Sequence, residues 1–201
     1  MEGAAEINVL QYFHHVDKDI TLAVNSWSSP FTDFLWKTFS DQQVWYLLYA
    51  VIAFFIIYRM GWKRGLAAIL SLVLTVVLCD QTGNLVKNSV CRLRPCWDGY
   101  MIENGLRVLE GKGGQYGFFS AHAANAAGFA VCSAICFRLD KKHGYGTYDK
   151  AIALWAFMVG VSRVFVGKHF VGDVAVGFAV GVIYGLATGL LCRRLTERYL
   201  P

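Results

Sequence analysis

Long apolar runs separated by short charged turns limit what this chain can fold into more than any other feature. These runs cover residues 42–58, 66–85, 118–137, 151–161 and 174–192. A membrane span needs about 20 mostly apolar residues, and the first two runs reach that length once their flanks are counted. Of the 201 residues, 56% are hydrophobic and 16% are charged, which is well below the roughly 25% charged of soluble domains. The sequence predicts an all-α, multi-pass transmembrane helix bundle of about five or six spans.

The segment before the first run has a different character. It is polar at first and then amphipathic from Ile20 to Phe39, with an interruption at Ser28-Ser29-Pro30. Such a pattern is typical of one or two short helices that lie in the plane of the membrane. We therefore expect an N-terminal interfacial segment over residues 1–41 and a transmembrane domain over residues 42–201.

The distribution of cations predicts the orientation of the spans. In a five-span arrangement the turns 59–64 and 138–150 and the tail from residue 193 all fall on one side, and all are rich in lysine and arginine. Positive charge marks the cytoplasmic side of a membrane protein. The N-terminal segment and the loops 87–117 and 163–169 are then expected on the outer side.

The stretch from Ser162 to Asp173 places two cations, an imidazole and a carboxylate between two apolar runs. A charge at mid-bilayer costs about 2.5–3.5 kcal/mol on insertion scales, so these groups either anchor the chain at the interface or have a function. If Phe170 opens a helix, His169 and Asp173 are one turn apart on one face. The carboxylate can then orient the imidazole and raise its basicity, as a nucleophile or base requires.

Three segments from separate helices meet on the outer side and gather polar groups there. They are the end of the second run, the start of the third, and the turn that joins the fourth to the fifth. Together they supply Lys87, Arg94, Ser120, His122, Arg163, His169 and Asp173. Guanidinium groups bind phosphate oxygens in pairs, a lysine adds a compact charge, and a helix N-terminus adds free N–H groups. The set suits a phosphoryl group held without a metal.

The spacing of these residues resembles a known three-part signature. The parts are Lys87-x6-Arg94-Pro95, Ser120-x-His122, and Ser162-Arg163-x5-His169-x3-Asp173. They are similar to those of the phosphatidic acid phosphatase type 2 superfamily, the lipid phosphate phosphatases. The second part departs from the usual Pro-Ser-Gly-His, because Phe119 replaces proline and Ala121 replaces glycine. A methyl group at Ala121 would crowd the phosphate if that position required a positive φ.

The resemblance implies a role for each residue of the signature. His169 would be the nucleophile that forms a phosphohistidine, Asp173 would orient it, and His122 would be the general acid for the leaving group. The residues that bind the phosphate would be Lys87, Arg94, Ser120 and Arg163. Neither a metal nor another cofactor is implied.

The function expected from these features is a metal-independent lipid phosphatase on the periplasmic face of the cytoplasmic membrane. The first candidate substrates are a polyprenyl diphosphate, such as undecaprenyl diphosphate, and a lipid A phosphate; the alternatives are phosphatidylglycerol phosphate and phosphatidic acid. A different hypothesis is a non-enzymatic carrier that holds an anionic lipid with the same cations. The expected partners are the bilayer and its lipid phosphate; there is no basic stripe interleaved with aromatic residues of the kind that binds nucleic acid.

Other polar residues have simpler interpretations. Cys91 and Cys96 are either free or form a disulfide. Arg92 and Lys168 are expected to anchor the chain at the interface. Asp80 and Asn84 share a helix face with Lys87 and either support it, which is the favoured interpretation, or form polar packing between helices. A further set is expected to be solvated: His14, His15, His143, Glu103, Arg107, Glu110 and Lys112.

Overall fold

The computed structural model describes residues 9–200, with side chains from residue 11, and every regular element in that range is a helix. The α-helices are α1 (Val9–Asn25), α2 (Pro30–Ser40), α3 (Tyr46–Met60), α4 (Trp62–Val90), α5 (Gly99–Glu103), α6 (Ala121–Phe137), α7 (Gly146–Phe165) and α8 (Val171–Tyr199). The 3-10 turns η1 and η2 cover Gln42–Trp45 and Pro95–Trp97. The predicted all-α class is confirmed.

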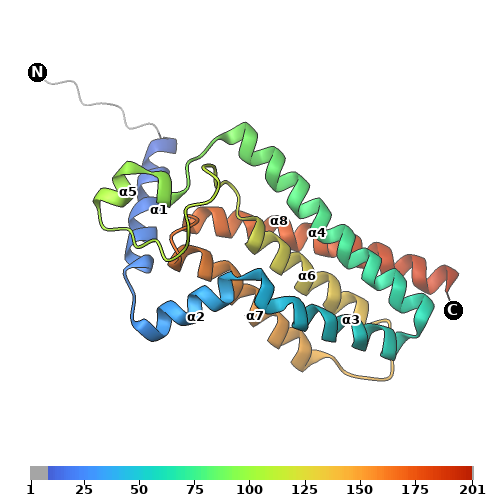
Figure 1. Cartoon of the computed structure of the whole chain (residues 1–201). Helices are drawn as coiled ribbons and strands as arrows, with labels where there is room; N and C mark the ends of the chain where they lie inside the picture. The colour runs from blue at the N-terminus through green and yellow to red at the C-terminus, as the bar shows by residue number, and fades with distance from the viewer. Residues whose placement is uncertain (1–8, 201) are drawn as a thin grey trace, which may run out of the picture.

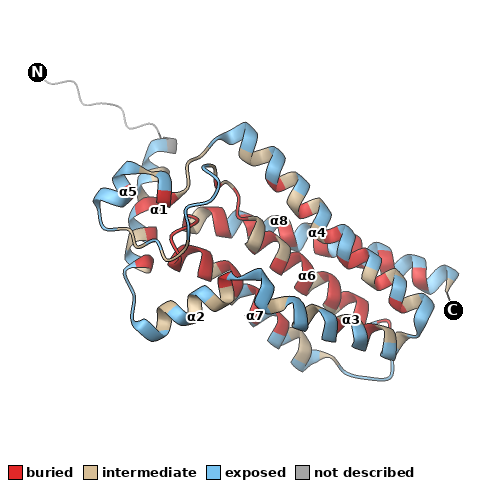
Figure 2. Ribbon diagram, viewed as in Figure 1, coloured by how far each residue is buried: buried red, intermediate tan, exposed pale blue. Residues whose placement is uncertain are grey.

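Five helices form an elongated bundle, and each coincides with one of the predicted apolar runs. Figure 1 shows α3, α4, α6, α7 and α8 side by side, with α1 and α5 together at one end and the C-terminus at the other. Helix α6 packs against α8, α7 and α4, and most of its residues are buried. Figure 2 shows this buried centre between helices whose outer faces are exposed. Alanine and glycine make up much of α6, which lets neighbouring backbones approach closely.

Close packing between α6 and α8 depends on glycines spaced four residues apart. Gly177, Gly181 and Gly185 all lie on the face of α8 that meets α6. A Cβ added to Gly181 would lie 2.2 Å from the carbonyl oxygen of Ala124, and one added to Gly185 would lie 2.7 Å from that of Gly128. Any side chain there would push the two helices apart.

The outer surface of the bundle is apolar. Leu47, Phe54, Leu70, Leu154 and Ile183 are each at least 60% exposed, and such a continuous apolar surface needs lipid around it. Within residues 9–200, three segments are long and apolar enough to cross a membrane: Gln42–Met60, Trp62–Val90 and Val171–Tyr199. The apolar α6 has 17 residues and lies among the other helices rather than against the surrounding lipid.

The N-terminal segment forms two helices, and the predicted break between them is confirmed. Ser29 caps α2 by accepting a hydrogen bond from the Thr32 N–H at 3.1 Å, and Pro30 occupies the first turn. Helix α1 begins at Val9, well before the amphipathic stretch that starts at Ile20. Its polar residues contact the protein: Lys18 Nζ, for example, lies 2.7 Å from Asp98 Oδ2. Residues 1–8 of the predicted segment lie outside the described part of the chain.

The loop between α4 and α6 crosses the same end of the bundle as α1. Cys91 ends α4 in the left-handed conformation, with φ of 52°. Cys91 and Cys96 are both free thiols, so the disulfide alternative is wrong. Cys96 is fully buried, and its Sγ lies 3.6 Å from the carbonyl oxygen of Lys112.

Candidate active site

The predicted site residues all come from the end of the bundle that α1 and α5 cover (Figure 1). They lie on the last turn of α4, the following loop, the first turn of α6, the last turn of α7, and the start of α8. The charges of Arg163, Arg94 and Lys87 all act on His169. Helices distant in sequence therefore bring these groups together, as the signature predicted.

His169 and Asp173 form the predicted imidazole–carboxylate pair. His169 Nδ1 lies 3.5 Å from Asp173 Oδ2, and the two side chains are 2% and 0% exposed. Phe170 is the N-cap of α8, and its N–H donates to the same carboxylate oxygen at 3.1 Å. The backbone at the start of α8 thus fixes Asp173, and the carboxylate lies beside the ring of His169, whose buried Nδ1 has no hydrogen-bond partner in the described structure.

Arg92 holds the other oxygen of this carboxylate. Its Nη1 lies 2.6 Å from Asp173 Oδ1, and its Nη2 lies 2.7 Å from Asp17 Oδ2. The guanidinium also lies over the ring of Phe170, at 4.2 Å from the centroid. The expectation that Arg92 is an interfacial anchor was wrong, because this side chain bridges α1 to the first turn of α8.

Helix α1 supplies partners for the backbone N–H groups that α8 cannot satisfy in its first turn. Asp17 Oδ1 accepts from the Gly172 N–H at 2.9 Å, and Thr21 Oγ1 accepts from the Val171 N–H at 3.1 Å. His14, expected to be solvated, is half-buried, and its Nδ1 lies 3.2 Å from Arg92 Nη2.

Asn25, the last residue of α1, connects this helix to α7 in the same way. Its side-chain amide donates to the carbonyl oxygens of Val164 and Phe165 at 3.2 and 2.9 Å. Its carbonyl accepts from the Arg107 N–H at 2.8 Å. The predicted solvated position of Arg107 was wrong, because its guanidinium also pairs with Asp33.

Two hydrogen bonds of Ser120 hold the start of α6, one to α8 and one within the first turn of α6. Ser120 is fully buried, its N–H donates to the carbonyl oxygen of Asp173 at 3.0 Å, and its Oγ accepts from the Ala123 N–H at 3.4 Å. Among residues 9–200, Cys91 is the one non-glycine residue with positive φ. Ala121 is therefore ordinary helix, and its methyl group does not impose the strain that the sequence raised as a concern.

Arg94 is held by the loop that returns to α6. Its N–H donates to the Gln115 carbonyl at 2.9 Å, and its Nε donates to the Tyr116 carbonyl at 3.0 Å. Gly117 follows, and a Cβ added there would lie 2.8 Å from Arg94 Cγ and 3.5 Å from His169 Nδ1. Only glycine permits the loop to pass this close to the imidazole.

Arg163 lies on the last turn of α7 and is 5% exposed. Its Nη1 donates to Ser40 Oγ and lies 3.5 Å from Glu110 Oε2, while its Nε is buried without a hydrogen-bond partner in the described structure. Glu110 was expected to be solvated, and this contact corrects that interpretation. Lys168 was expected to be an anchor, yet it is 4% exposed and donates to the Gly111 carbonyl.

Lys87 and His122 complete the group. Lys87 is half-buried on α4. The predicted support beneath it is only partly present: Asp80 accepts from the Asn125 amide at 2.8 Å rather than contacting Lys87 directly, and Asn84 is exposed.

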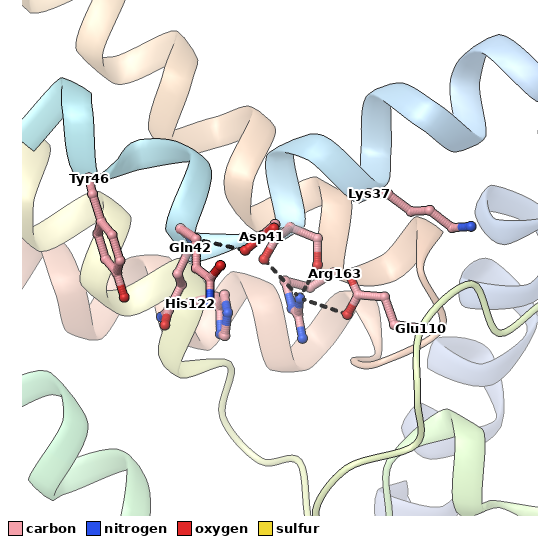
Figure 3. A pocket seen from close by; sticks show the side chains of 9 residues that line it. Lys37, Asp41, Gln42, Tyr46, Glu110, His122 and Arg163 are labelled. Atoms are coloured by element: carbon pink, nitrogen blue, oxygen red, sulfur yellow. Dashed lines mark hydrogen bonds and ion pairs between the residues drawn. The ribbon is translucent and has the colours of Figure 1, made fainter.

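His122 faces a cavity of about 550 Å³ together with Arg163. Figure 3 shows these two side chains beneath the start of α3.

The electrostatics keep His169 neutral. Burial lowers the pKa of its imidazole well below the usual 6.5, and the charges of Arg163, Arg94 and Lys87 lower it further. With Nδ1 directed at Asp173, the other ring nitrogen is left for chemistry. A neutral imidazole can act as a nucleophile on a phosphoryl group, and the three neighbouring cations can bind the oxygens of that group.

Comparison with known proteins agrees with this geometry. A family model described as the PAP2 superfamily matches residues 64–197, and the chain belongs to this superfamily. The protein is accordingly a multi-pass membrane phosphatase, and the carrier hypothesis is set aside.

Two curated relatives extend beyond the family match. The lipid A 4'-phosphatase of Bacteroides thetaiotaomicron is 30% identical over 94% of this chain and 83% of its own length. The lipid A 4'-phosphatase of Porphyromonas gingivalis is 29% identical over 88% of this chain and 72% of its own. Among solved structures, a transmembrane PAP2-type phosphatidylglycerolphosphate phosphatase from Bacillus subtilis shares the fold, with a TM-score of 0.70 at 21% identity over 98% of this chain and 91% of that one.

Proposed function

We propose that this phosphatase removes a phosphate from a lipid A-type substrate through a covalent phosphohistidine at His169. The observation that carries the proposal is the buried neutral imidazole, with Nδ1 on Asp173 and three cations acting on the ring. The names of the two curated relatives favour lipid A over undecaprenyl diphosphate, phosphatidylglycerol phosphate and phosphatidic acid.

The proposed reaction has two displacements at phosphorus. His169 Nε2 forms a bond to phosphorus as the bond to the leaving oxygen breaks, and His122 donates a proton to that oxygen. Water then attacks the phosphohistidine, gives a proton to His122, and releases inorganic phosphate and neutral His169. General acid–base catalysis of this kind contributes about 10²–10⁴-fold.

In this proposal the phosphate oxygens are held by fixed positive groups. Lys87, Arg94 and Arg163 neutralise the charge, and Ser120 with the first N–H groups of α6 adds donors at a helix N-terminus. The chain's own cations are enough to hold the charge, so we propose no metal or other cofactor.

We further propose that the site faces the periplasm from the cytoplasmic membrane. At the opposite end of the bundle, Arg64 Nε donates to the carbonyl oxygen of Leu200 at 2.7 Å, and Arg59 Nη1 lies 2.6 Å from His143 Nε2. These contacts bring the cationic turns and the C-terminal tail to one end, which supports a cytoplasmic position by the positive-inside rule. Residues 1–41 would then form an interfacial segment at the outer surface, and residues 42–201 the transmembrane phosphatase domain.

The test is phosphate release from purified lipid A by the detergent-solubilised protein, with EDTA present. His169→Ala should abolish turnover, and His122→Ala should lower kcat by about 10²–10⁴-fold. The exposed His15→Ala is the matched control and should behave as wild type. Wild-type protein denatured at alkaline pH, where a phosphohistidine is stable, should carry label transferred from lipid A with a labelled phosphate. Wild-type turnover by His169→Ala would refute the mechanism.

A further inference from the structure

The cavity in front of His122 continues past the signature residues. It measures about 550 Å³, and its wall includes Lys37 of α2, the connection to α3, and Glu110 of the long loop. Figure 3 shows Gln42 and Tyr46 on the side of His122, with Glu110 and Lys37 on the far side of Arg163. None of the wall residues of α2, η1 or α3 belongs to the three-part signature.

Several polar groups on this wall have no partner within the described part of the protein. The carboxamides of Gln42 and Gln43 and the hydroxyl of Tyr46 make no side-chain hydrogen bond there, and all three residues are exposed. Asp41, by contrast, accepts from the Gln43 N–H at 2.9 Å. A carboxamide carries both donors and an acceptor, so it pairs with a hydroxyl group in either direction.

The charges around the cavity balance. Lys37 and Arg163 are the two cations that line it, and Asp41 and Glu110 are the two carboxylates. Arg163 already contacts Glu110 at 3.5 Å. A second phosphate bonded directly to the leaving oxygen, as in a diphosphate, would therefore lie near two carboxylates, whereas a sugar ring at that oxygen meets the free carboxamides and the phenol.

An apolar groove begins where this polar wall ends. Gln42 and Tyr46 also line a second cavity of about 430 Å³ between α3 and α4. The remainder of that groove is mostly apolar and includes Tyr49, Leu72 and Val76. A lipid with its head group beside His122 could thus lay an acyl chain along the groove without leaving the protein surface.

We propose that the wall formed by Gln42, Gln43 and Tyr46 is the subsite for the leaving group, and that it selects a leaving oxygen carried by a sugar ring rather than by a second phosphate. The inference rests on the proposed function, because His122 as general acid places the leaving oxygen at the mouth of this cavity. The subsite favours phosphate esters of sugars over polyprenyl diphosphates, whose leaving group is itself a phosphate.

The experiment compares kcat/KM for three substrates in the same detergent: lipid A, dioctanoyl phosphatidic acid and undecaprenyl diphosphate. Wild-type protein should prefer lipid A. The double variant Gln42→Ala/Gln43→Ala should lower the ratio of kcat/KM for lipid A to that for phosphatidic acid by about tenfold, since each lost hydrogen bond to a neutral group is worth several-fold. Gln11→Ala, an exposed glutamine on α1 outside the cavity, is the matched control.

The outcomes separate the two proposals. Wild-type protein that releases phosphate from none of these lipids would refute the proposed function. Active wild-type protein that prefers lipid A but shows an unchanged ratio in the double variant would refute the leaving-group subsite and leave the proposed function intact. Undecaprenyl diphosphate as the preferred substrate would refute both the subsite and the lipid A assignment. A thermal midpoint equal to that of Gln11→Ala shows that the double variant is folded.

Discussion

Arg92 Nη1 lies 2.6 Å from Asp173 Oδ1, and the second oxygen of that carboxylate lies 3.5 Å from His169 Nδ1. The carboxylate therefore stands between a guanidinium and an imidazole, each on its own oxygen. Because Asp17 of α1 holds the same guanidinium at 2.7 Å, the surroundings of His169 depend on a helix outside the signature.

The first prediction concerns this chain of contacts. Arg92→Ala leaves the fully buried Asp173 without its ion-pair partner, and the carboxylate is then free to turn away from His169. A misplacement of about 1 Å at a reacting group costs on the order of 10²-fold, so kcat should fall by that amount while KM changes little. Steady-state kinetics on lipid A measures both values.

Two controls separate positioning from general damage. Arg92→Lys keeps a cation beside Asp173 and should recover part of kcat. Arg193→Ala breaks the exposed Arg193–Glu197 contact at 3.2 Å and should leave kcat as in wild type, because such surface pairs contribute about 0–1 kcal/mol. If Arg92→Ala raises KM alone, Arg92 binds substrate and does not position Asp173.

The second prediction concerns the closest approach of backbone to the site. In Gly117→Ala the new Cβ would lie 2.8 Å from Arg94 Cγ, so the guanidinium must move. Overpacking of this kind costs about 1–3 kcal/mol, and we expect at least a tenfold lower kcat/KM. Gly114→Ala, where a Cβ has nothing within 4 Å, should retain wild-type kinetics; equal losses in both variants would contradict this assignment.

The third prediction concerns the packing of α6 on α8. Gly181→Ala would set a Cβ 2.2 Å from the carbonyl oxygen of Ala124, and the helices can relieve this only by separating. The thermal midpoint in detergent should fall by several degrees. Gly144→Ala, in a turn where a Cβ meets nothing within 4 Å, should keep its midpoint, and an unchanged midpoint in Gly181→Ala would show that the helices are not packed at this position.

Local spacing in the sequence was enough to predict the pair at His169 and Asp173. Four residues at the start of a helix place two side chains on one face, whatever surrounds them. The five bundle helices were predicted for a similar reason, since apolar runs of this length have few other ways to bury themselves.

The partners of that pair could not be predicted in the same way. In the sequence Arg92 looks like any loop cation. Its partners are Asp17 of α1, 75 positions away, and Asp173 of α8, 81 positions away, and only the fold brings them together. A signal was nevertheless present: the polar residues at positions 14, 17, 21 and 25 are three or four residues apart, and Lys18 is adjacent to the second of them. In the structure these residues lie on the side of α1 that contacts the rest of the protein.

The last prediction concerns pH. The proposed attack by His169 requires its neutral form, and burial lowers the pKa of this imidazole well below 6.5. The acidic limb of kcat/KM should therefore lie below pH 6.5.

The same pKa shift predicts how stability depends on pH. Between the folded-state pKa and 6.5 the unfolded chain binds a proton at this position and the folded chain does not. Stability therefore falls as the pH drops through that window. His169→Asn removes this group, and between pH 7 and pH 5 it should lose less stability than wild type. An equal loss in both proteins would mean that His169 is not held neutral by burial.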